Sequence, residues 1–483
     1  MQQQSLLPFV LQGNAVALSR PQDADPSTLR CIRGSRMAAT YSIPLHSIGG
    51  KEVERHKRAL TMVPSDNGFN GQGSTTFEAF LVSEDRMHVP RFYGFETWGA
   101  AEVDALCDGR PMDVAFAGTL NPVQEEATST TIAQLSKPPH GALLVLPCGY
   151  GKTVCALFIA HALRRRTLVL VHKGFLVSQW HERARAFLPQ ATIGKIQQNI
   201  VDADADVVVG MVQSISKRDY PAHILDQFGT IIIDEAHHMS APIFSKALHC
   251  LPGKRILGLS ATPERKDGLT RLLYHSMGTI AHRIERKPEH TMVSCMLYEG
   301  GARKEITYRD GRVSLPLMLN ALVADPVRND LIATHIVRYL ANDRYVIVLT
   351  DRLSQLKDLM KLLIDKGIDA HDIAFYIGST PADERDRASR RRCVLSTYSM
   401  AKEGLDIPRL DTLIMATPKG DIVQASGRVQ RKHAEKRVPL IVDIVDTFSV
   451  FEALRWKRWN FYRKEQFNCQ AFAIERDDVS WFA

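Results

Sequence analysis

From about residue 120 onward, short apolar runs rich in β-branched residues alternate with stretches of helical periodicity. The first five runs are Ala142–Leu146, Thr167–Val171, Asp206–Met211, Thr230–Ile233 and Arg255–Leu259. The next five are Tyr345–Leu349, Ile373–Tyr376, Cys393–Ser396, Thr412–Met415 and Pro439–Ile444. Continuous apolar runs of this length, separated by helical segments, predict buried parallel strands in βα units. The two series therefore predict an α/β protein with two tandem, doubly wound lobes and parallel sheets.

The segments outside these two series have a different composition. Residues 1–115 combine glycine-rich and polar pieces with the strand-like runs Phe77–Val82 and His88–Tyr93, which predicts a small N-terminal α+β domain. Residues 285–325 are mixed and contain turn signals such as Asp310-Gly311. We therefore predict an accessory domain over 1–115, a first lobe over 116–290, a linker over 291–325 and a second lobe over 326–483.

The composition is that of an ordinary globular protein, with 45% hydrophobic and 24% charged residues among 483. It excludes a wholly disordered, collagen-like or coiled-coil chain. No apolar run approaches the ~18–20 residues that a membrane span needs, and no basic segment precedes the first apolar residues. The eight cysteines form no C-x-x-C pair, which is typical of a reducing compartment. We therefore expect an intracellular protein without a membrane partner.

The net charge of +8 is unevenly distributed. Residues 1–120 carry a net charge of −2, residues 121–320 carry +7, and residues 321–483 carry +3. A polyanionic partner therefore fits the two lobes better than the N-terminal domain.

A candidate phosphate-binding loop follows the strand predicted at Ala142–Leu146. Residues 146–153 read LPCGYGKT and lead into the helical run Val154–Ala162. Such a loop exposes backbone N–H groups and a helix N-terminus to phosphates, while the lysine reaches the β- and γ-phosphates and the threonine hydroxyl ligates Mg²⁺. Leu146 departs from the G-x-x-x-x-G-K-S/T pattern, and the structural alternative is a simple glycine turn. The candidate nucleotide-binding residues are Pro147, Cys148, Gly149, Tyr150, Gly151, Lys152 and Thr153.

Two carboxylates follow a second predicted strand. Asp234 and Glu235 come at the end of the run Thr230–Ile233, which places them at the C-terminal edge of a parallel sheet, where ligands bind in such folds. Asp234 is suited to hold Mg²⁺ and Glu235 to polarise the attacking water. An acidic cap at a helix start is the structural alternative, but the phosphate-binding loop upstream favours the functional interpretation.

These motifs and others in the same order make the chain resemble superfamily 2 helicases. The further matches are Leu120–Gln124 (LNPVQ), Ile231–His238 (IIIDEAHH), Leu259–Pro263 (LSATP), Thr397–Pro408 (TYSMAKEGLDIP) and Gln424–Arg431 (QASGRVQR). The resemblance covers residues 116–465. The segments Val171–Trp180, Ala261–Gly268 and Val442–Phe448 are similar to XPB-type DNA helicases. That group includes helicases of phages, iridoviruses and poxviruses, so a viral source is suspected.

The resemblance implies two RecA-like lobes with ATP and Mg²⁺ in the cleft between them, and it implies a role for individual residues. Gln124 would recognise adenine, Gly404 and Asp406 would contact the nucleotide, and Arg428 and Arg431 would be arginine fingers. A helical turn between these two arginines would let both face the cleft. The residues that would couple hydrolysis to movement are His237, Ser260, Thr262 and Gln424.

The function that follows is an ATP-dependent DNA helicase or translocase that contacts mainly the phosphate backbone. The alternatives are a duplex-stimulated ATPase that remodels transcription or repair complexes, an RNA helicase, and a DNA-binding module without activity. The XPB-type resemblance implies 3′→5′ movement. A viral source would place the protein in the host nucleus, in a cytoplasmic virus factory or in the virion.

Three basic segments allow two interpretations. The triplets Arg164–Arg166 and Arg390–Arg392 precede strands, and solvated helix ends are favoured over phosphate contacts. Near the C-terminus, Trp456, Trp459, Phe461 and Tyr462 alternate with lysines and arginines. That pattern is typical of a stacking and charged surface, although an amphipathic helix packed on the second lobe is favoured.

Overall fold

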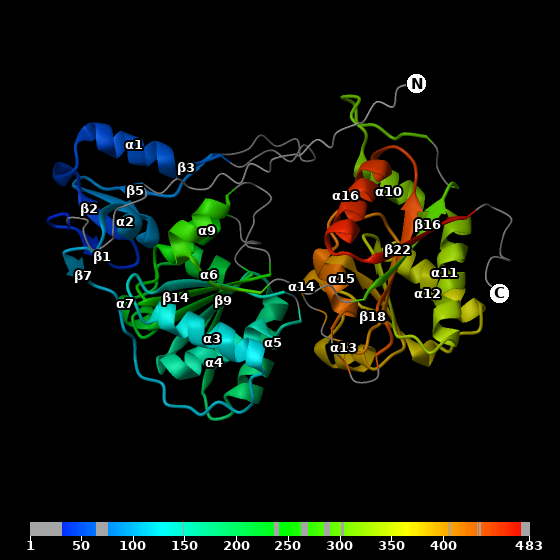
Figure 1. Cartoon of the computed structure of the whole chain (residues 1–483), viewed down its shortest axis with the longest axis horizontal. Helices are drawn as coiled ribbons and strands as arrows, with labels where there is room; N and C mark the ends of the chain where they lie inside the picture. Colours follow the sequence, from blue (N-terminus) through cyan, green and yellow to red (C-terminus); the bar gives the residue numbers. More distant parts are fainter. Residues whose placement is uncertain are drawn as a thin grey trace, which may run out of the picture.

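The computed structural model describes residues 31–63, 76–147, 149–235, 241–261, 269–284, 290–300, 304–403, 405, 407–431, 433 and 436–474. Figure 1 shows two α/β lobes side by side, with the N-terminal domain on the first. We refer to residues 116–284 as lobe 1 and to residues 290–474 as lobe 2. Within the described residues, no helix is both long and apolar enough to cross a bilayer.

Lobe 1 is built on an eight-stranded sheet in the order β11-β10-β12-β9-β13-β14-β8-β15, parallel except for the β10–β11 pair. The strands are β8 (Gly141–Val145), β9 (Thr167–Val171), β10 (Ile193–Gln197), β11 (Ile200–Asp202), β12 (Val207–Met211), β13 (Thr230–Asp234), β14 (Arg255–Ser260) and β15 (Ile280–Arg283). The five predicted apolar runs form the central strands β8, β9, β12, β13 and β14. Their side chains are buried on both faces, which explains why the runs are continuous rather than alternating.

Helices cover both faces of this sheet. One face packs on α3 (Pro122–Leu135), α4 (Lys152–Leu163) and α5 (Gly174–Phe187). The other packs on α6 (Val212–Lys217), α8 (Ala241–Leu248) and α9 (Thr270–Met277), with the short α7 (Ala222–Leu225) at its rim.

The N-terminal domain has the predicted α+β composition, but it shares its core with lobe 1. Its sheet has the order β5-β6-β2-β1-β7. The elements are β1 (Arg36–Met37), β2 (Tyr41–Pro44), α1 (Gly50–Leu60), β3 (Thr61–Met62), β4 (Phe77–Glu78), β5 (Leu81–Val82), β6 (Arg86–Val89), α2 (Arg91–Trp98) and β7 (Val103–Asp104). The run His88–Tyr93, predicted as a strand, is half strand and half helix, because β6 ends at Val89 and α2 begins at Arg91, directly after Pro90.

Helix α2 attaches this domain to lobe 1. The Phe92 ring lies 2.0 Å from the position that a Cβ on Gly141 would take, so glycine at the start of β8 permits the contact. Arg91 is 2% exposed, and its guanidinium donates to the carbonyls of Gly253 (3.0 Å) and Lys254 (3.1 Å). Burial lowers the pKa of Arg91 to about 9. The predicted boundary at residue 115 therefore divides the chain but does not divide the hydrophobic core.

Lobe 2 is built on a seven-stranded, all-parallel sheet in the order β18-β19-β17-β20-β21-β16-β22. Its strands are β16 (Met292–Tyr298), β17 (Val346–Thr350), β18 (Ile373–Tyr376), β19 (Cys393–Thr397), β20 (Thr412–Met415), β21 (Leu440–Asp446) and β22 (Asn468–Ile474). One face packs on α11 (Pro326–Ala341) and α12 (Leu353–Asp365), and the other on α14 (Tyr398–Glu403), α15 (Val423–Val429) and α16 (Val450–Lys464). Helices α10 (Leu315–Val323) and α13 (Ala382–Ser389) complete the lobe.

The predicted linker over 291–325 needs correction. Residues 292–298 form β16, which bonds to β21 on one side and to β22 on the other, and α10 packs its apolar face on Phe451 and Leu454 of α16. Strand β16 lies inside the lobe 2 sheet although 47 residues separate it in sequence from β17. Because β16 pairs only with the last two strands of the lobe, the sequence around β16 does not indicate that it belongs to the lobe 2 sheet.

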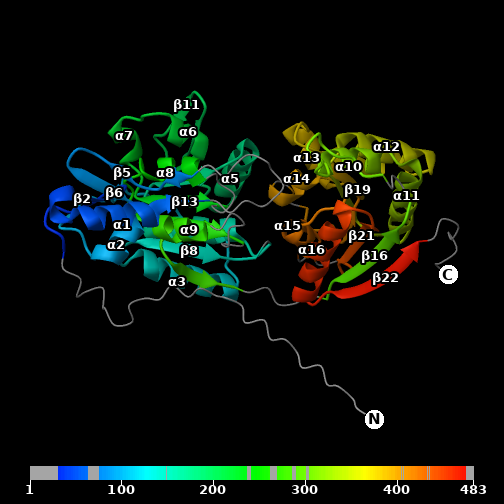
Figure 2. The ribbon, with the colours of Figure 1, turned by 90° about the horizontal axis from the view of Figure 1, so that it is seen from above.

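The two lobes have the same strand order. If the seven strands of lobe 2 are numbered along the chain, and those of lobe 1 likewise without β11, both sheets read 3-4-2-5-6-1-7. Strand β16 is thus the equivalent of β8, and β21 of β14. This equivalence defines two corresponding positions at the C-terminal ends of the strands, one in each lobe, and Figure 2 shows the lobes from above.

Candidate active site

The phosphate-binding loop connects β8 to α4 as the sequence predicts. Gly149 (φ 89°) and Gly151 (φ 80°) adopt left-handed conformations that favour glycine. Helix α4 begins at Lys152, and no side chain caps its first turn. The loop therefore presents a helix N-terminus to the C-terminal edge of the sheet, which is an anion-binding arrangement. Cys148 lies outside the described residues.

Lys152 and the two predicted carboxylates come together at this edge. The Lys152 Nζ lies 3.2 Å from Glu235 Oε1, and both side chains are mostly buried. Asp234 is the last residue of β13, while Glu235 follows it in a left-handed conformation (φ 47°). The backbone turn at Glu235 directs two consecutive side chains toward one site, whereas two residues of a regular strand would point to opposite faces. Thr153 is the second residue of α4 and lies beside Lys152.

Asp234 carries a perturbed carboxyl group. Burial, and next the neighbouring Glu235 carboxylate, raise the pKa of Asp234 to about 6. The Trp180 indole Nε1 donates a 2.9 Å hydrogen bond to Asp234 Oδ2, and this bond and the Lys152 charge both lower the pKa of Asp234. Motif reasoning gave Trp180 no role. Its place in a helix that follows β9 was the one available signal, because an indole N–H that is buried usually finds an acceptor.

Gln124 connects helix α3 to the phosphate-binding loop. Its backbone N–H and side chain form a capping box with Asn121, and its Nε2 donates to the carbonyl of Tyr150 at 3.1 Å. A Cβ on Gly151 would lie 2.4 Å from that Nε2. Gln124 therefore supports the loop directly, a contact that the predicted role in adenine recognition did not include.

Ser260 lies at the other side of the loop. It is the fully buried last residue of β14, and its carbonyl accepts a 3.0 Å hydrogen bond from the Leu146 N–H. The strand that carries Ser260 is thus bonded to the first residue of the phosphate-binding loop. His237 and Thr262, predicted for the same coupling, lie outside the described residues.

Lobe 2 contributes the arginine motif through α15, and the two arginines differ. Arg428 is buried, and its Nε and Nη1 donate to the carbonyls of Ala401 and Leu405, the latter at 2.8 Å. Helix α15 ends at Val429, so Arg431 lies beyond it. The Arg431 Cγ lies 3.3 Å from the position that a Cβ on Gly149 would take. Arg431 therefore lies beside the phosphate-binding loop, whereas two carbonyls of lobe 2 hold the Arg428 guanidinium, and the expected role of Arg428 in the cleft stays a prediction.

The other predicted residues of lobe 2 are only partly placed. Gln424 is a buried residue of α15. Gly404 and Asp406 lie outside the described residues. Among the described residues, the predicted site residues that lie together are Gln124, Gly149, Tyr150, Gly151, Lys152, Asp234, Glu235 and Arg431.

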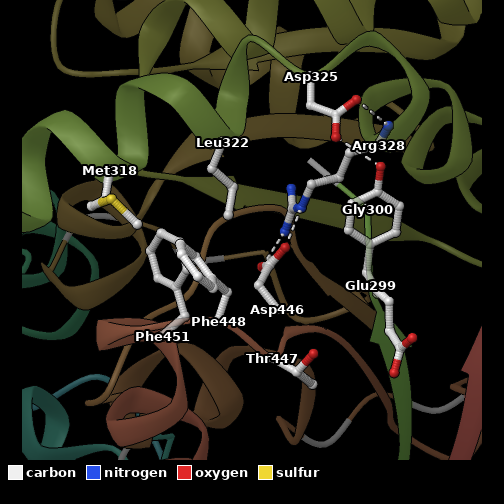
Figure 3. A pocket seen from close by; sticks show the side chains of 11 residues that line it. Glu299, Gly300, Met318, Leu322, Asp325, Arg328, Asp446, Thr447, Phe448 and Phe451 are labelled. Atoms are coloured by element: carbon white, nitrogen blue, oxygen red, sulfur yellow. Dashed lines mark hydrogen bonds and ion pairs between the residues drawn. The ribbon is translucent and has the colours of Figure 1, made fainter. Parts of the chain in front are cut away.

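The corresponding position in lobe 2 is a cavity of about 300 Å³, which Figure 3 shows from close by. Tyr298 and Asp446, the last residues of β16 and β21, line it together with Asp325, which precedes α11, and Arg328 of α11. Asp325 caps α11 by accepting from the N–H groups of Val327 (3.0 Å) and Arg328 (3.3 Å). A carboxylate thus occupies the place that a phosphate would take, so the position in lobe 1 is the one suited to nucleotide.

The basic triplets lie away from this site. Arg165 and Arg255 both pair with Asp108, at 2.6 and 2.7 Å, near the start of β9 and β14. Arg390 pairs with Asp386 at 2.9 Å in lobe 2. These contacts agree with a structural interpretation of both triplets rather than with phosphate binding.

Comparison with known families agrees with the two-lobe architecture. Residues 117–265 match the family described as the type III restriction enzyme, res subunit, and residues 330–433 match the helicase conserved C-terminal domain. A protein of Acanthamoeba polyphaga mimivirus, provisionally named an ATP-dependent RNA helicase, is 31% identical over 449 residues. The match covers 90% of this chain and 86% of that protein. An African swine fever virus protein with the same provisional name is 28% identical and is covered over 71% of its length, against 69% of this chain.

Solved structures share the fold. A fragment of an HsdR subunit of a type I restriction enzyme from Vibrio vulnificus matches with a TM-score of 0.52 and 16% identity, over 75% of this chain and 70% of the other. Yeast Dbp5 bound to RNA matches with a TM-score of 0.50 and 15% identity, over 74% and 90%. The chain belongs to the superfamily 2 helicases and is an ATP-hydrolysing nucleic-acid helicase related to those of large viruses.

Proposed function

We propose that the protein is an ATP-driven DNA helicase or translocase whose nucleotide site lies on lobe 1 and is completed by Arg431 of lobe 2. The observation that carries this proposal is the position of Arg431 beside Gly149, in the loop that leads to Lys152 and its ion pair with Glu235. Binding of ATP to one lobe and contact by the other would link the state of the nucleotide to the distance between the lobes.

Each residue of lobe 1 has a distinct task in this proposal. Lys152 exchanges its ion pair with Glu235 for the β- and γ-phosphates of ATP. Glu235 then accepts a hydrogen bond from the attacking water and orients it. Thr153 and Asp234 would hold Mg²⁺, which supplies positive charge next to the phosphate oxygens. The buried carboxylate and the threonine hydroxyl are oxygen ligands that suit Mg²⁺, and the glycine turns leave room for the phosphates.

The arginines of lobe 2 act differently. Arg431 provides a guanidinium for the charge that develops on the γ-phosphoryl group, a contribution of about 10³–10⁵ in rate where it has been measured in other phosphoryl-transfer enzymes. Arg428 is a positioning residue, because its hydrogen bonds hold the backbone at Ala401 and Leu405, on either side of Gly404. Gly404 and Asp406 would contact the nucleotide from that segment.

Coupling between hydrolysis and movement would run along β14. Ser260 is bonded to the start of the phosphate-binding loop, and Thr262 follows it two residues later. His237 would bridge from the carboxylates to this segment, and Gln424 would respond from α15. A change at the γ-phosphate would thereby reach the segments that contact nucleic acid.

DNA is the substrate that we propose. The support is the similarity to XPB-type enzymes, the Gln424 that opens the arginine motif, and a first-lobe family described as a restriction enzyme subunit. The test is ATPase activity with single-stranded DNA, duplex DNA or RNA as the effector. Stimulation by DNA is expected, and stimulation by RNA alone would overturn the assignment.

An RNA helicase is the second candidate function. It is favoured by the provisional names of the mimivirus and African swine fever virus relatives, which are RNA helicases. The same ATPase comparison decides between the two nucleic acids. Transcription or repair proteins would be partners if the enzyme remodels complexes without unwinding.

Strand displacement separates a helicase from such a remodelling ATPase. The resemblance to XPB-type enzymes predicts unwinding of duplexes with a 3′ single-stranded tail and little unwinding with a 5′ tail. DNA-stimulated ATPase activity without any displacement would favour remodelling. Displacement from 5′ tails alone would contradict the proposed polarity.

A further inference from the structure

Helix α16 has an inner face that anchors it to lobe 2. Phe451 and Leu454 pack on α10, while Arg458 and Tyr462 are fully buried against β21. The Arg458 Nε and the Tyr462 hydroxyl both donate to Asp443 Oδ2, at 2.7 and 2.9 Å. These contacts, together with the partly buried Trp459 and Phe461 that also pack on the lobe 2 core, fix the orientation of the helix.

The outer face of α16 has an unusual composition for a surface that only meets water. Its exposed residues follow helical spacing and are Ala453, Trp456, Lys457, Asn460, Arg463 and Lys464. The Trp456 side chain is 55% exposed, whereas Trp98 and Trp180 are buried. Arg455 lies over the Trp456 ring at 5.5 Å from its centre and pairs with Glu452 at 3.3 Å. An exposed indole next to several cations has the composition of a surface on which nucleic-acid bases stack.

The positive charge of the outer face indicates a polyanionic partner. Glu452 is the sole acidic residue in the sequence of α16, and its charge is balanced by Arg455. The exposed Arg463 and Lys464 therefore give the outer face an excess of positive charge. An aromatic ring flanked by cations suits a single-stranded nucleic acid, which stacks its bases and presents its phosphates to lysine and arginine.

The position of α16 in lobe 2 also suits a nucleic-acid contact. Figures 1 and 2 show α14, α15 and α16 on the side of lobe 2 that faces lobe 1. A Cβ on Gly420 would lie 3.1 Å from Lys457 Cδ, so the outer face begins beside the segment that leads into α15. From Trp456 to Lys464 the helix rises about 12 Å, a length that accommodates a few successive phosphates.

We infer that the outer face of α16 is an accessory binding surface for single-stranded nucleic acid, with a base stacked on Trp456 and phosphates held by Arg463 and Lys464. The inference rests on the assignment of the chain as a nucleic-acid helicase, and it adds a contact outside the helicase motifs. It also reconciles the two interpretations of this segment, because the inner face packs on lobe 2 while the outer face carries the stacking residue and the cations.

The test compares two kinds of variant of the full chain by fluorescence anisotropy with a labelled single-stranded DNA and a labelled single-stranded RNA. Trp456→Ala should weaken binding by about 5- to 150-fold without changing the salt dependence, because stacking releases no counterions. The double variant Arg463→Ala/Lys464→Ala should weaken binding and reduce the slope of log affinity against log salt by about 0.7 for each lost phosphate contact. Trp456→Phe should restore part of the affinity.

The matched control is Lys357→Ala/Lys361→Ala, which removes two exposed positive charges from α12 on the opposite face of the sheet. The control should bind like the wild type, and unchanged melting temperatures would show that all variants fold. Unchanged affinity of both α16 variants would overturn the inference, as would unchanged affinity with an altered oligomeric state, which would indicate a protein interface. If the wild type itself bound neither DNA nor RNA, the helicase assignment would fail instead.

Discussion

Arg431 of lobe 2 lies against Gly149 of lobe 1, with its Cγ 3.3 Å from the position that a Cβ on the glycine would occupy. The contact joins the end of the arginine motif to the phosphate-binding loop. Arg428, three residues earlier, is held inside lobe 2 by the carbonyls of Ala401 and Leu405. The same motif therefore contains one arginine at the site and one that shapes the lobe.

This difference predicts two distinct mutant phenotypes. Arg431→Ala should lower kcat by about 10³-fold or more with an unchanged melting temperature, since the guanidinium acts on the transition state. Arg428→Ala should lower the free energy of unfolding by about 1–3 kcal/mol, because it leaves buried carbonyls without donors. Steady-state ATPase assays and thermal melting of both variants provide the check. A stable Arg428→Ala protein with full activity would contradict the role given to that residue.

The Lys152–Glu235 pair predicts that binding and hydrolysis can be separated. Glu235→Gln keeps the size of the side chain and removes the charge that orients water, so turnover should be lost while ATP affinity stays within a few-fold of wild type. Lys152→Ala should weaken ATP binding as well, because it removes a charged contact to phosphate. Equilibrium binding of a fluorescent ATP analogue, measured beside turnover, distinguishes the two variants. Equal ATPase rates for Glu235→Gln and the wild type would disprove the proposed role.

The raised pKa of Asp234, about 6, predicts a pH-dependent affinity for Mg²⁺. The carboxylate form binds the cation, so affinity is full above pH 7 and falls as the pH drops through 6. Below pH 6 the protonated form predominates, so the apparent affinity for Mg²⁺ should be lower at pH 5 than at pH 7. Because the Trp180 indole stabilises the charged form, Trp180→Phe should move this transition to higher pH. Titration of Mg²⁺ into the nucleotide-bound protein at several pH values measures both effects.

The sequence predicts the central strands and the loops that follow them, since the apolar runs from Ala142 and Thr230 are buried on both faces and lead directly into motif residues. The strands β10, β16 and β22 were missed for two reasons. In β10 polar and apolar residues are mixed, and β16 and β22 pair with strands that are distant in the chain. The sequence could not predict the burial of Arg428 either, because hydrogen bonds to backbone carbonyls do not depend on which residues provide them. The shared core between α2 and lobe 1 likewise depends on contacts between residues far apart, such as Phe92 and Gly141.

That contact predicts a specific loss of stability. Gly141→Ala places a Cβ 2.0 Å from the Phe92 ring and 2.5 Å from the Met277 carbonyl, so the N-terminal domain must shift away from β8. Overpacking of this kind costs about 1–3 kcal/mol. The control is Gly50→Ala at the start of α1, where a Cβ meets no atom within 4 Å and stability should stay the same or rise slightly. Thermal melting of both variants, together with limited proteolysis of the N-terminal domain, measures the outcome.

The two equivalent positions in the lobes predict the nucleotide stoichiometry. In lobe 2, Asp325 occupies the N-terminus of α11 and also accepts a 2.7 Å hydrogen bond from the Tyr298 hydroxyl, so a phosphate would meet a carboxylate that is held in place. Isothermal titration with an ATP analogue should therefore give one site per chain, and Lys152→Ala should weaken that single site without exposing a second. Asp325→Ala should lower the melting temperature through loss of the helix cap, which is worth about 0.5–2 kcal/mol, while Asp325→Ser retains a capping oxygen and should lose less. Two sites of similar affinity in the wild type would show that the cap on α11 does not exclude phosphate.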